Sequence, residues 1–169
     1  MDGNWNIRRL DEEYEWDEFS CGESDLDTFL QQHAEENDRR GVSRLRVATR
    51  SDEVRIAGYY ASATGVFQRQ HLPKQSRSGL PGYPLPTIHM GRLAVDKESQ
   101  GQRLGEFLLF HFLQMALDVS GKVGVFAVDV WAKHDKARAF YLRYGFFPLI
   151  DDPLHLFLPM DSVRELLAD

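Results

Sequence analysis

The chain has 169 residues, of which 43% are hydrophobic and 27% are charged, and its formal net charge is −6 at pH 7. This length and composition are typical of an ordinary globular protein, and we expect a single domain over residues 1–169. The single cysteine, Cys21, excludes an internal disulfide and a cysteine-based metal cluster. Because no apolar run reaches the ~20 residues of a membrane-spanning helix, we expect no membrane partner. A lone cysteine suits a reducing cytosol, so we expect a cytoplasmic protein, and we expect no metal.

Charge is distributed unevenly over the first fifty residues. Residues 1–35 hold eleven acidic residues and two arginines, whereas residues 36–50 hold five arginines and two acidic residues. A basic segment on an acidic protein can contact a phosphate backbone, as nucleic-acid binding requires. The same segment can also be a solvated helix end with charges of both signs, so both interpretations stay open at this point.

The first half of the chain predicts a short strand over residues 6–10 and an amphipathic helix over 24–39. Ser24 is expected to cap this helix and Gly41 to end it. Helical spacing predicts that four residues of it face the core: Leu26, Phe29, Leu30 and His33. Two strands follow over residues 44–49 and 55–64, joined by a turn at 51–53.

Two features of the following segment stand out. Gly58, inside the second of these strands, indicates a bulge or the close approach of another segment. Residues 68–86 are rich in Pro, Gly and Ser and predict a long loop, and long loops in compact domains are usually functional or mobile. We expect this loop to shape the side of a functional site at which an acceptor substrate binds.

The second half of the chain alternates strands with helices. Further strands are predicted over residues 87–95, 123–131, 146–150 and 154–158. Helices are predicted over residues 102–119, 135–144 and 161–167. The longest helix carries one apolar stripe, made by Leu104, Leu108, Phe112 and Met115. This order of elements predicts an α/β fold around a mixed β-sheet.

A glycine-containing turn separates the strand over 87–95 from the helix that follows it. Residues 91–96 read GRLAVD and residues 100–105 read QGQRLG. Such a turn aims free backbone N–H groups and the positive end of a helix dipole at one point, where a phosphate is the natural ligand. The spacing is neither the dinucleotide fingerprint nor a Walker A loop. An ordinary strand-to-helix connection is the alternative.

This turn resembles the Gln/Arg-x-x-Gly-x-Gly/Ala pyrophosphate loop of the GNAT N-acetyltransferases, which bind acetyl-CoA. Gln100 and Gly105 fit the pattern, whereas Arg103 stands where the family more often has glycine. The resemblance implies a GNAT fold, with a central mixed sheet flanked by helices, and acetyl-CoA as cosubstrate. It also implies cofactor contacts from these residues: Leu93, Ala94, Val95, Gln100, Gly101, Gln102, Arg103, Leu104 and Gly105.

A second segment, residues 137–146, reads ARAFYLRYGF and resembles the GNAT pattern Ala-x-x-Phe-Tyr-x-x-x-Gly-Phe. The resemblance implies that Tyr141 is the general acid, since a phenol can give its proton to the thiolate that leaves acetyl-CoA. Tyr144 is the rival, and a core tyrosine without a catalytic role is the alternative. The same match assigns three more residues to the cofactor: Ala137, Phe140 and His134, the last where many members have Asn or Asp.

The sequence marks no clear general base for the amine. His89 is a candidate, because histidine titrates near neutral pH and this one shares a strand face with Leu93. A structural histidine, a water relay and an amine that is already neutral are the alternatives.

Several blocks resemble, more narrowly, the GNAT toxins of bacterial toxin–antitoxin pairs: residues 19–22, 26–30, 37–44, 80–86 and 91–96. Such toxins acetylate the α-amine of the amino acid on charged tRNA, which blocks translation. The resemblance implies aminoacyl-tRNA as substrate, a ribbon-helix-helix antitoxin as partner and a homodimer. Four arginines are candidates for tRNA phosphates: Arg39, Arg40, Arg44 and Arg92.

Two other functions stay open on the sequence. A GNAT enzyme that acetylates a small amine, a peptide or a protein N-terminus is favoured if the acidic N-terminal stretch lines the acceptor entrance. A weakly catalytic CoA-binding protein that acts through protein interaction is the third hypothesis.

Overall fold

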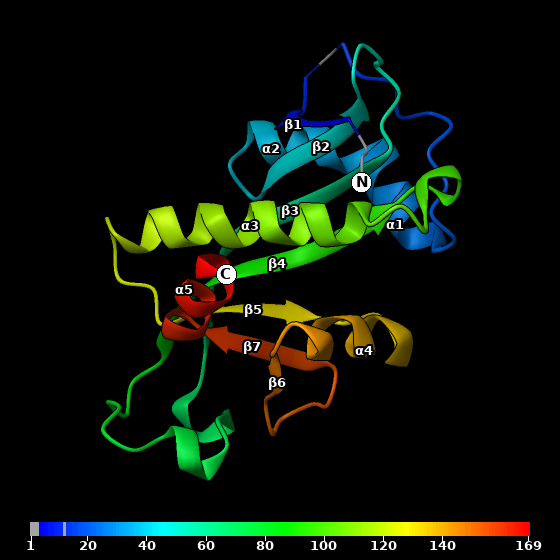
Figure 1. The fold of residues 1–169 in the computed structure, drawn as a ribbon. Coiled ribbons are helices and arrows are strands. Elements are labelled where there is room, and N and C mark those ends of the chain that lie inside the picture. The colour runs from blue at the N-terminus through cyan, green and yellow to red at the C-terminus, as the bar shows by residue number, and fades with distance from the viewer. Residues whose placement is uncertain (1–3, 12) are drawn as a thin grey trace. The chain divides into compact units, whose positions relative to one another are not determined.

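The computed structural model describes residues 4–11 and 13–169. It contains a mixed seven-stranded sheet in the order β1-β2-β3-β4-β5-β7-β6 (Figure 1). The strands are β1 (Trp5–Arg9), β2 (Arg44–Arg50), β3 (Gly58–Phe67), β4 (Leu85–Val95), β5 (Ala127–Trp131), β6 (Phe147–Pro148) and β7 (His155–Pro159). The predicted α/β fold with a mixed sheet is confirmed.

Helices and helical turns connect these strands. The α-helices are α1 (Ser24–Thr28), α2 (Ala34–Arg39), α3 (Leu104–Ser120), α4 (Asp135–Arg143) and α5 (Met160–Ala168). A π-helical turn, η1 (Phe29–His33), joins α1 to α2, and three 3-10 turns are η2 (Arg69–His71), η3 (Lys74–Ser76) and η4 (Lys97–Ser99). None of the described helices combines the length and the apolar character needed to cross a bilayer.

Strand pairing makes the sheet mixed. β1 pairs with β2, and β2 with β3, in antiparallel register. β4 pairs with β5 in parallel, with His89 opposite Asp129. β7 is antiparallel to both β5 and β6.

The chain divides into two compact units. Unit 1 comprises Met1–Ala63 and Gly91–Phe112, and unit 2 comprises Thr64–Met90 and Leu113–Asp169. Three elements, β3, β4 and α3, contribute residues to both units. The two groups of candidate site residues are therefore described unit by unit.

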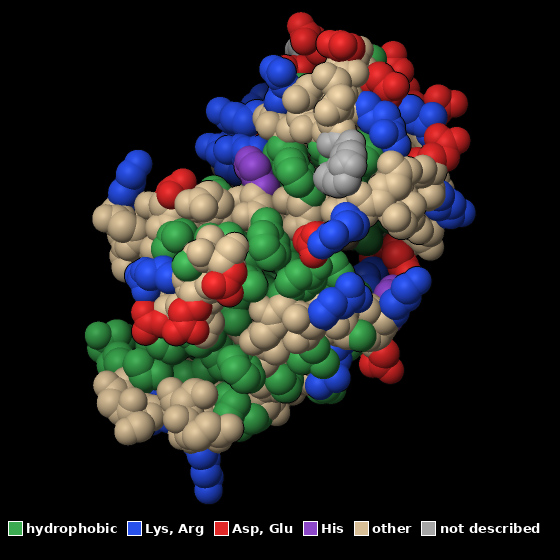
Figure 2. All heavy atoms as spheres, viewed as in Figure 1, with side chains coloured by type: hydrophobic (Ala, Val, Ile, Leu, Met, Phe, Trp, Pro, Cys, Tyr) green, Lys and Arg blue, Asp and Glu red, His purple; other side chains and the backbone are tan. Residues whose placement is uncertain are grey.

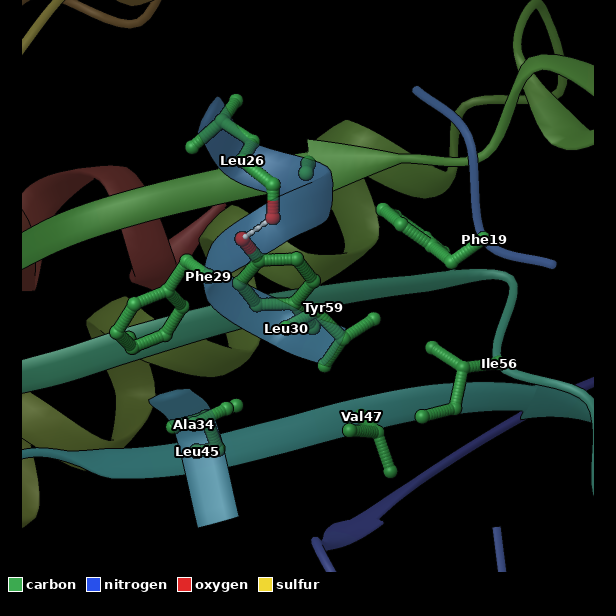
Figure 3. Packing of buried hydrophobic residues seen from close by; sticks show 11 residues of the cluster. Phe19, Leu26, Phe29, Leu30, Ala34, Leu45, Val47, Ile56 and Tyr59 are labelled. Atoms are coloured by element: carbon green, nitrogen blue, oxygen red, sulfur yellow. Dashed lines mark hydrogen bonds between the residues drawn. The ribbon is translucent and has the colours of Figure 1, made fainter. Parts of the chain in front are cut away.

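In unit 1 the segment α1–η1–α2 packs against β2 and β3 (Figure 3). Leu26, Phe29, Leu30 and Ala34 are buried in this core. The Tyr59 hydroxyl donates a hydrogen bond to the Leu26 carbonyl oxygen over 2.7 Å, and Figure 3 marks that bond.

The predictions for this helical segment need two corrections. His33 is exposed, because the wide π turn places Ala34 rather than His33 against the core. Ser24 does not cap the helix: Glu23 is the N-cap residue, and no side-chain cap hydrogen bond is present there. Gly41 follows α2 with a positive φ of 75°, as a residue that ends a helix in the left-handed region does.

Gly58 was predicted to mark either a bulge or the close approach of another segment, and the structure shows a close approach. A Cβ at this position would lie 3.0 Å from Leu108 Cδ1 and 3.1 Å from both Ala94 O and Leu104 Cδ2. Leu104, Leu108 and Phe112 of α3 are buried as predicted, whereas Met115 is only half-buried. Gly58 thus lets β3 lie against the first turns of α3 without an intervening side chain.

Unit 2 contains the two strands that differ most from prediction. β5 begins at Ala127 instead of residue 123, since Val123 is 59% exposed and residues 123–126 are irregular. β6 has only two residues. The buried core of this unit is formed by Phe67, Leu72, Leu85, Ala127, Leu149 and Phe157.

The predicted long loop has structure of its own. Between β3 and β4 it forms the 3-10 turns η2 and η3. The Arg77 guanidinium donates to the carbonyl oxygens of Leu72 (2.8 Å) and Gln70 (3.0 Å), and Arg69 donates to the Arg77 carbonyl oxygen (3.2 Å). Arginine side chains therefore donate hydrogen bonds to backbone carbonyl oxygens of the loop that have no strand partner.

Candidate functional site

The turn between β4 and α3, in unit 1, is pinned by Asp96. Its buried carboxylate accepts hydrogen bonds from the Ser20 N–H at Oδ1 (2.9 Å) and from the Glu98 N–H at Oδ2 (3.1 Å). The Arg55 guanidinium lies 3.7 Å from Asp96 Oδ2 and 2.9 Å from Glu98 Oε2. These contacts fix the point at which the chain leaves β4.

The side chain of Gln100 supports the turn. Its side-chain amide donates to the carbonyl oxygens of Val95 and Cys21, each over 2.9 Å. The Gln100 side chain thus supports the turn through its amide nitrogen. Its assignment to acetyl-CoA stays a prediction.

The next residues give the turn its anion-binding geometry. Gly101 (φ 82°) and Arg103 (φ 65°) both have left-handed backbones, and residues 100–103 are exposed. α3 begins at the buried Leu104. The first N–H groups of a helix have no acceptor within it, so those of Leu104 and Gly105 point outward from the helix end and suit a phosphate.

The side chains of the turn are occupied around this backbone. The Arg103 guanidinium contacts Glu106 Oε1 over 2.7–3.0 Å, and Gln102 Oε1 accepts a hydrogen bond from Arg50 (2.7 Å). The predicted strand residues Leu93 and Val95 are half-buried and Ala94 is buried. Turn and strand end together fit a pyrophosphate held by backbone groups.

The four predicted arginines fall into two places within unit 1. Arg39 and Arg40 both form ion pairs with Glu36, and Arg44 pairs with Asp38 Oδ1 at 3.3 Å. All three keep more than half of their side chains exposed. Arg92 lies on β4, with its guanidinium carbon 3.7 Å from the centre of the Phe29 ring in the π turn.

Figure 2 shows how basic and acidic side chains intermix over unit 1. A hollow there of about 470 Å³ is lined mainly by acidic side chains: Leu10, Asp11, Glu13, Glu35, Asp38 and Arg39. The basic segment is therefore neither isolated nor uniform, because three of its arginines, Arg39, Arg40 and Arg44, lie beside a carboxylate.

Tyr141 of unit 2 is buried on α4 between two rings. The ring centroid of Phe140 lies 5.2 Å away and that of Phe146 5.5 Å away. Burial raises the pKa of Tyr141, so the phenol stays protonated at neutral pH. Among the described residues its hydroxyl has no hydrogen-bond partner, which leaves its proton for a ligand.

The other predicted residues of this helix have structural contacts. His134 is the N-cap of α4, and its Nδ1 accepts a hydrogen bond from the Ala137 N–H over 3.2 Å. Ala137 and Phe140 are half-buried. Tyr144, the rival to Tyr141, lies at the C-cap, where its ring centroid is 5.3 Å from that of Phe140.

Unit 2 also holds a buried polar array that the sequence did not reveal as a group. Asp129 Oδ2 lies 3.0 Å from His89 Nδ1 and 2.8 Å from His155 Nε2. The other nitrogen of His155, Nδ1, lies 3.4 Å from Asp151 Oδ2. The Trp131 indole stacks on the His155 ring with centroids 4.2 Å apart. Only His89 of this array was a candidate, and the missed signal was an acid, Asp129, inside an apolar strand.

Charge within the array follows from these contacts. Burial by itself would raise the pKa of Asp129, but hydrogen bonds from His155 and His89 lower it to about 2. Burial by itself would lower the pKa of His155, but its hydrogen bonds to Asp129 and Asp151 raise it. The array therefore contains an ionised Asp129 beside a His155 that favours the charged form. Among the described residues no group of three or more potential ligands could hold a metal ion.

Comparison with known proteins identifies several relatives. The acetyltransferase (GNAT) family matches residues 7–146. The tRNA-acetylating toxin of Mycobacterium tuberculosis (strain ATCC 25618 / H37Rv) is 37% identical over 169 residues, which cover 100% of both chains.

Two solved structures are similar along nearly all of their length. AtaT complexed with acetyl-methionyl-tRNAfMet has a TM-score of 0.90 at 32% identity, covering 96% of this chain and 99% of that one. A tyrosine-to-phenylalanine mutant of the AtaT toxin, bound to the C-terminus of the antitoxin AtaR and to acetyl-CoA, has a TM-score of 0.85 at 29% identity. It covers 98% of this chain and 99% of that one. With the family match over most of its length, this chain belongs to the GNAT family of acetyltransferases.

Proposed function

We propose that this protein is an acetyl-CoA-dependent N-acetyltransferase that acetylates the α-amine of aminoacyl-tRNA and thereby blocks translation. The observation that carries the proposal is the likeness, over 96% of this chain, to AtaT complexed with acetyl-methionyl-tRNAfMet. A relative named for tRNA acetylation, identical at 37% of positions over the full length, supports the same acceptor.

The turn after β4 has the role of holding the pyrophosphate of acetyl-CoA. Backbone N–H groups from Gly101 to Gly105 surround the anion, and the guanidinium of Arg103 adds positive charge nearby. The end of β4, from Leu93 to Val95, offers backbone groups to the pantetheine arm. We assign His134, Ala137 and Phe140 of unit 2 to further contacts with the cosubstrate.

Tyr141 has the role of general acid. Bound acetyl-CoA supplies the acetyl group as a thioester, and the acceptor nitrogen forms the new C–N bond while the C–S bond breaks. Tyr141 gives its phenolic proton to the departing sulfur and regains one from the second N–H of the acceptor through solvent. The absence of a hydrogen-bond partner for its hydroxyl among the described residues suits this donation.

The arginines of unit 1 have the role of contacting tRNA phosphates. Arg39, Arg40 and Arg44 are exposed beside carboxylates, which keep their guanidinium groups oriented in the free protein. Arg92 is held over Phe29 and keeps its charge for a phosphate near the reacting end of the tRNA.

The proposal extends to partners and location. AtaT is bound to the C-terminus of the antitoxin AtaR in a structure similar to this chain, and we propose a ribbon-helix-helix antitoxin of the same kind here. A cytoplasmic location follows from an acceptor that is charged tRNA, and we propose a homodimer on the resemblance to GNAT toxins.

Induced expression in a bacterial host tests the proposal. Wild type is expected to arrest growth and to produce N-acetyl-aminoacyl-tRNA, detected by mass spectrometry of the tRNA pool, whereas Tyr141→Phe is expected to do neither. Tyr144→Phe, at the C-cap of the same helix, is the matched control and should retain both effects. Normal growth without acetylated tRNA, from a wild type that binds acetyl-CoA, would reject the tRNA acceptor.

A small cationic amine is the second candidate acceptor. The hollow lined by Asp11, Glu13, Glu35 and Asp38 favours it, because four carboxylates attract a cationic polyamine and repel a phosphate. Acetylation of spermidine by the purified protein, with no product on charged tRNA, would establish this alternative.

A further inference from the structure

The array centred on Asp129 contains a histidine with one nitrogen committed and one available. His89 Nδ1 contacts Asp129 Oδ2, whereas His89 Nε2 has no hydrogen-bond partner among the described residues. Its side chain is 26% exposed, against 4% for that of Asp129. The ring therefore joins a buried carboxylate to a more accessible position on β4.

The protonation of this ring follows from its partner. An ionised carboxylate only accepts hydrogen bonds, so the nitrogen that contacts Asp129 must carry the proton. In a neutral ring the other nitrogen then has a free lone pair. Asp129 thus selects the tautomer of His89 in which Nε2 is basic, as a buried aspartate does for the base of a hydrolase triad.

Polar groups from neighbouring segments surround Asp129 and its histidine partners. His155 of β7 donates to the same carboxylate oxygen, and Asp151, from the segment before β7, contacts the far nitrogen of His155. His71 of η2 lies 3.9 Å from Asp151 Oδ2. On β3, Gly65 leaves room for the array, since a Cβ there would lie 2.8 Å from Thr87 Oγ1 and 3.2 Å from His89 Cβ.

We propose that His89 is the general base that deprotonates the acceptor amine, and that Asp129 is its positioning residue. This inference rests on the proposed function and adds the proton acceptor that the reaction lacks. The α-ammonium of the acceptor gives one proton to Nε2 before its nitrogen attacks. After the C–N bond forms and Tyr141 protonates the sulfur, His89 releases that proton to solvent, so the whole reaction yields one free proton.

The experiment compares kcat/KM of wild type and His89→Gln on charged tRNA between pH 6.5 and pH 8.5, in short incubations. Because an α-amino group has a pKa of about 7.7–8.0, the wild-type advantage should be about 20-fold at pH 6.5 and within about twofold at pH 8.5. A merely structural role would give the same ratio at every pH, which would overturn the proposal. His33→Gln, an exposed histidine outside the array, is the matched control and should track wild type.

A second measurement does not depend on any acceptor. The nitrogen NMR spectrum of ¹⁵N-histidine-labelled wild type should place the His89 proton on Nδ1, with the signal assigned by its loss in His89→Gln. Asp129→Asn should shift this proton toward Nε2, while the melting temperature and the affinity for acetyl-CoA report whether the variant is folded. A proton on Nε2 in wild type would overturn the proposal, whereas an inactive wild type with the expected spectrum would reject only the tRNA acceptor.

Discussion

The turn after β4 in unit 1 and the polar array of unit 2 are built by opposite means. The turn uses backbone: left-handed residues Gly101 and Arg103 lead into a helix end whose N–H groups are unpaired. The array uses side chains that are buried and paired with one another, with Asp129 at its centre. A backbone site tolerates side-chain changes that keep its conformation, whereas a buried side-chain site responds to the loss of a single atom.

The largest expected effect belongs to Tyr141→Phe, which removes one oxygen from unit 2. We expect kcat to fall by roughly 10²- to 10⁴-fold, the usual contribution of a general acid, while KM for acetyl-CoA stays unchanged. Stability should change little, because the hydroxyl has no hydrogen-bond partner among the described residues. Steady-state kinetics with purified protein measure this, and a fall in acetyl-CoA affinity instead would assign Tyr141 to binding.

Asp129→Asn tests how much the buried carboxylate of the array contributes to the stability of the fold. The pKa of Asp129 is lowered from 3.8 to about 2 in the folded protein, so the ionised carboxylate stabilises the fold above pH 3.8. This contribution, about 2 kcal/mol, is lost as the pH falls through about 2. We therefore expect the difference in unfolding free energy between wild type and Asp129→Asn to narrow by that amount between pH 5 and pH 2, measured by urea unfolding.

The stabilising contribution of His155 changes with pH in the opposite direction to that of Asp129. Because its pKa is raised in the folded protein, its stabilising contribution is full below its ordinary value of 6.5 and is lost as the pH rises through the raised value. The same urea series, extended to alkaline pH, should show wild type losing stability relative to His155→Gln. Parallel curves for the two proteins across the whole range would mean that the histidine is neutral.

Gly101→Ala tests the backbone site. The left-handed φ of 82° costs an alanine about 1–2 kcal/mol, so the turn should shift and KM for acetyl-CoA should rise by about 10-fold. Gly79→Ala is a close control, because Gly79 has a φ of 79° and, like Gly101, has no atom within 4 Å of the point where an alanine methyl group would lie. Equal stability losses in both variants, with a KM change only in Gly101→Ala, would locate the anion at the turn.

The same contrast explains what could be predicted from the sequence. The turn is contiguous, so residues 100–105 carried its signature, and the structure adds that the Gln100 side-chain amide bonds to the carbonyl oxygens of Val95 and Cys21. The array joins His89 to residues 40 and 66 positions away, across three strands whose order no local pattern specifies. The only sequence signal for this array was Asp129, a carboxylate within an apolar run.

The errors in the predicted elements have equally local causes. A π turn at Phe29–His33 shifts the helical phase, so a periodicity of 3.6 residues assigned His33 to the core in place of Ala34. The apolar run over 123–131 predicted one long strand, but hydrophobicity alone does not require pairing, and β5 begins only where its residues pair with β4 and β7.

The smallest expected effect concerns the arginines around α2. Each phosphate contact removed should lower the slope of log affinity against log salt by about 0.7–0.9, so Arg39→Ala with Arg40→Ala should reduce the slope for charged tRNA by about 1.4–1.8 at most. Both arginines already pair with Glu36 in the free protein, so the reduction should fall below this maximum. Arg164→Ala, an exposed arginine paired with Asp161 on α5, is the matched control and should leave the slope unchanged. If all three proteins share one slope while their KM for acetyl-CoA is equal, tRNA binds elsewhere, and the basic segment is a solvated helix end.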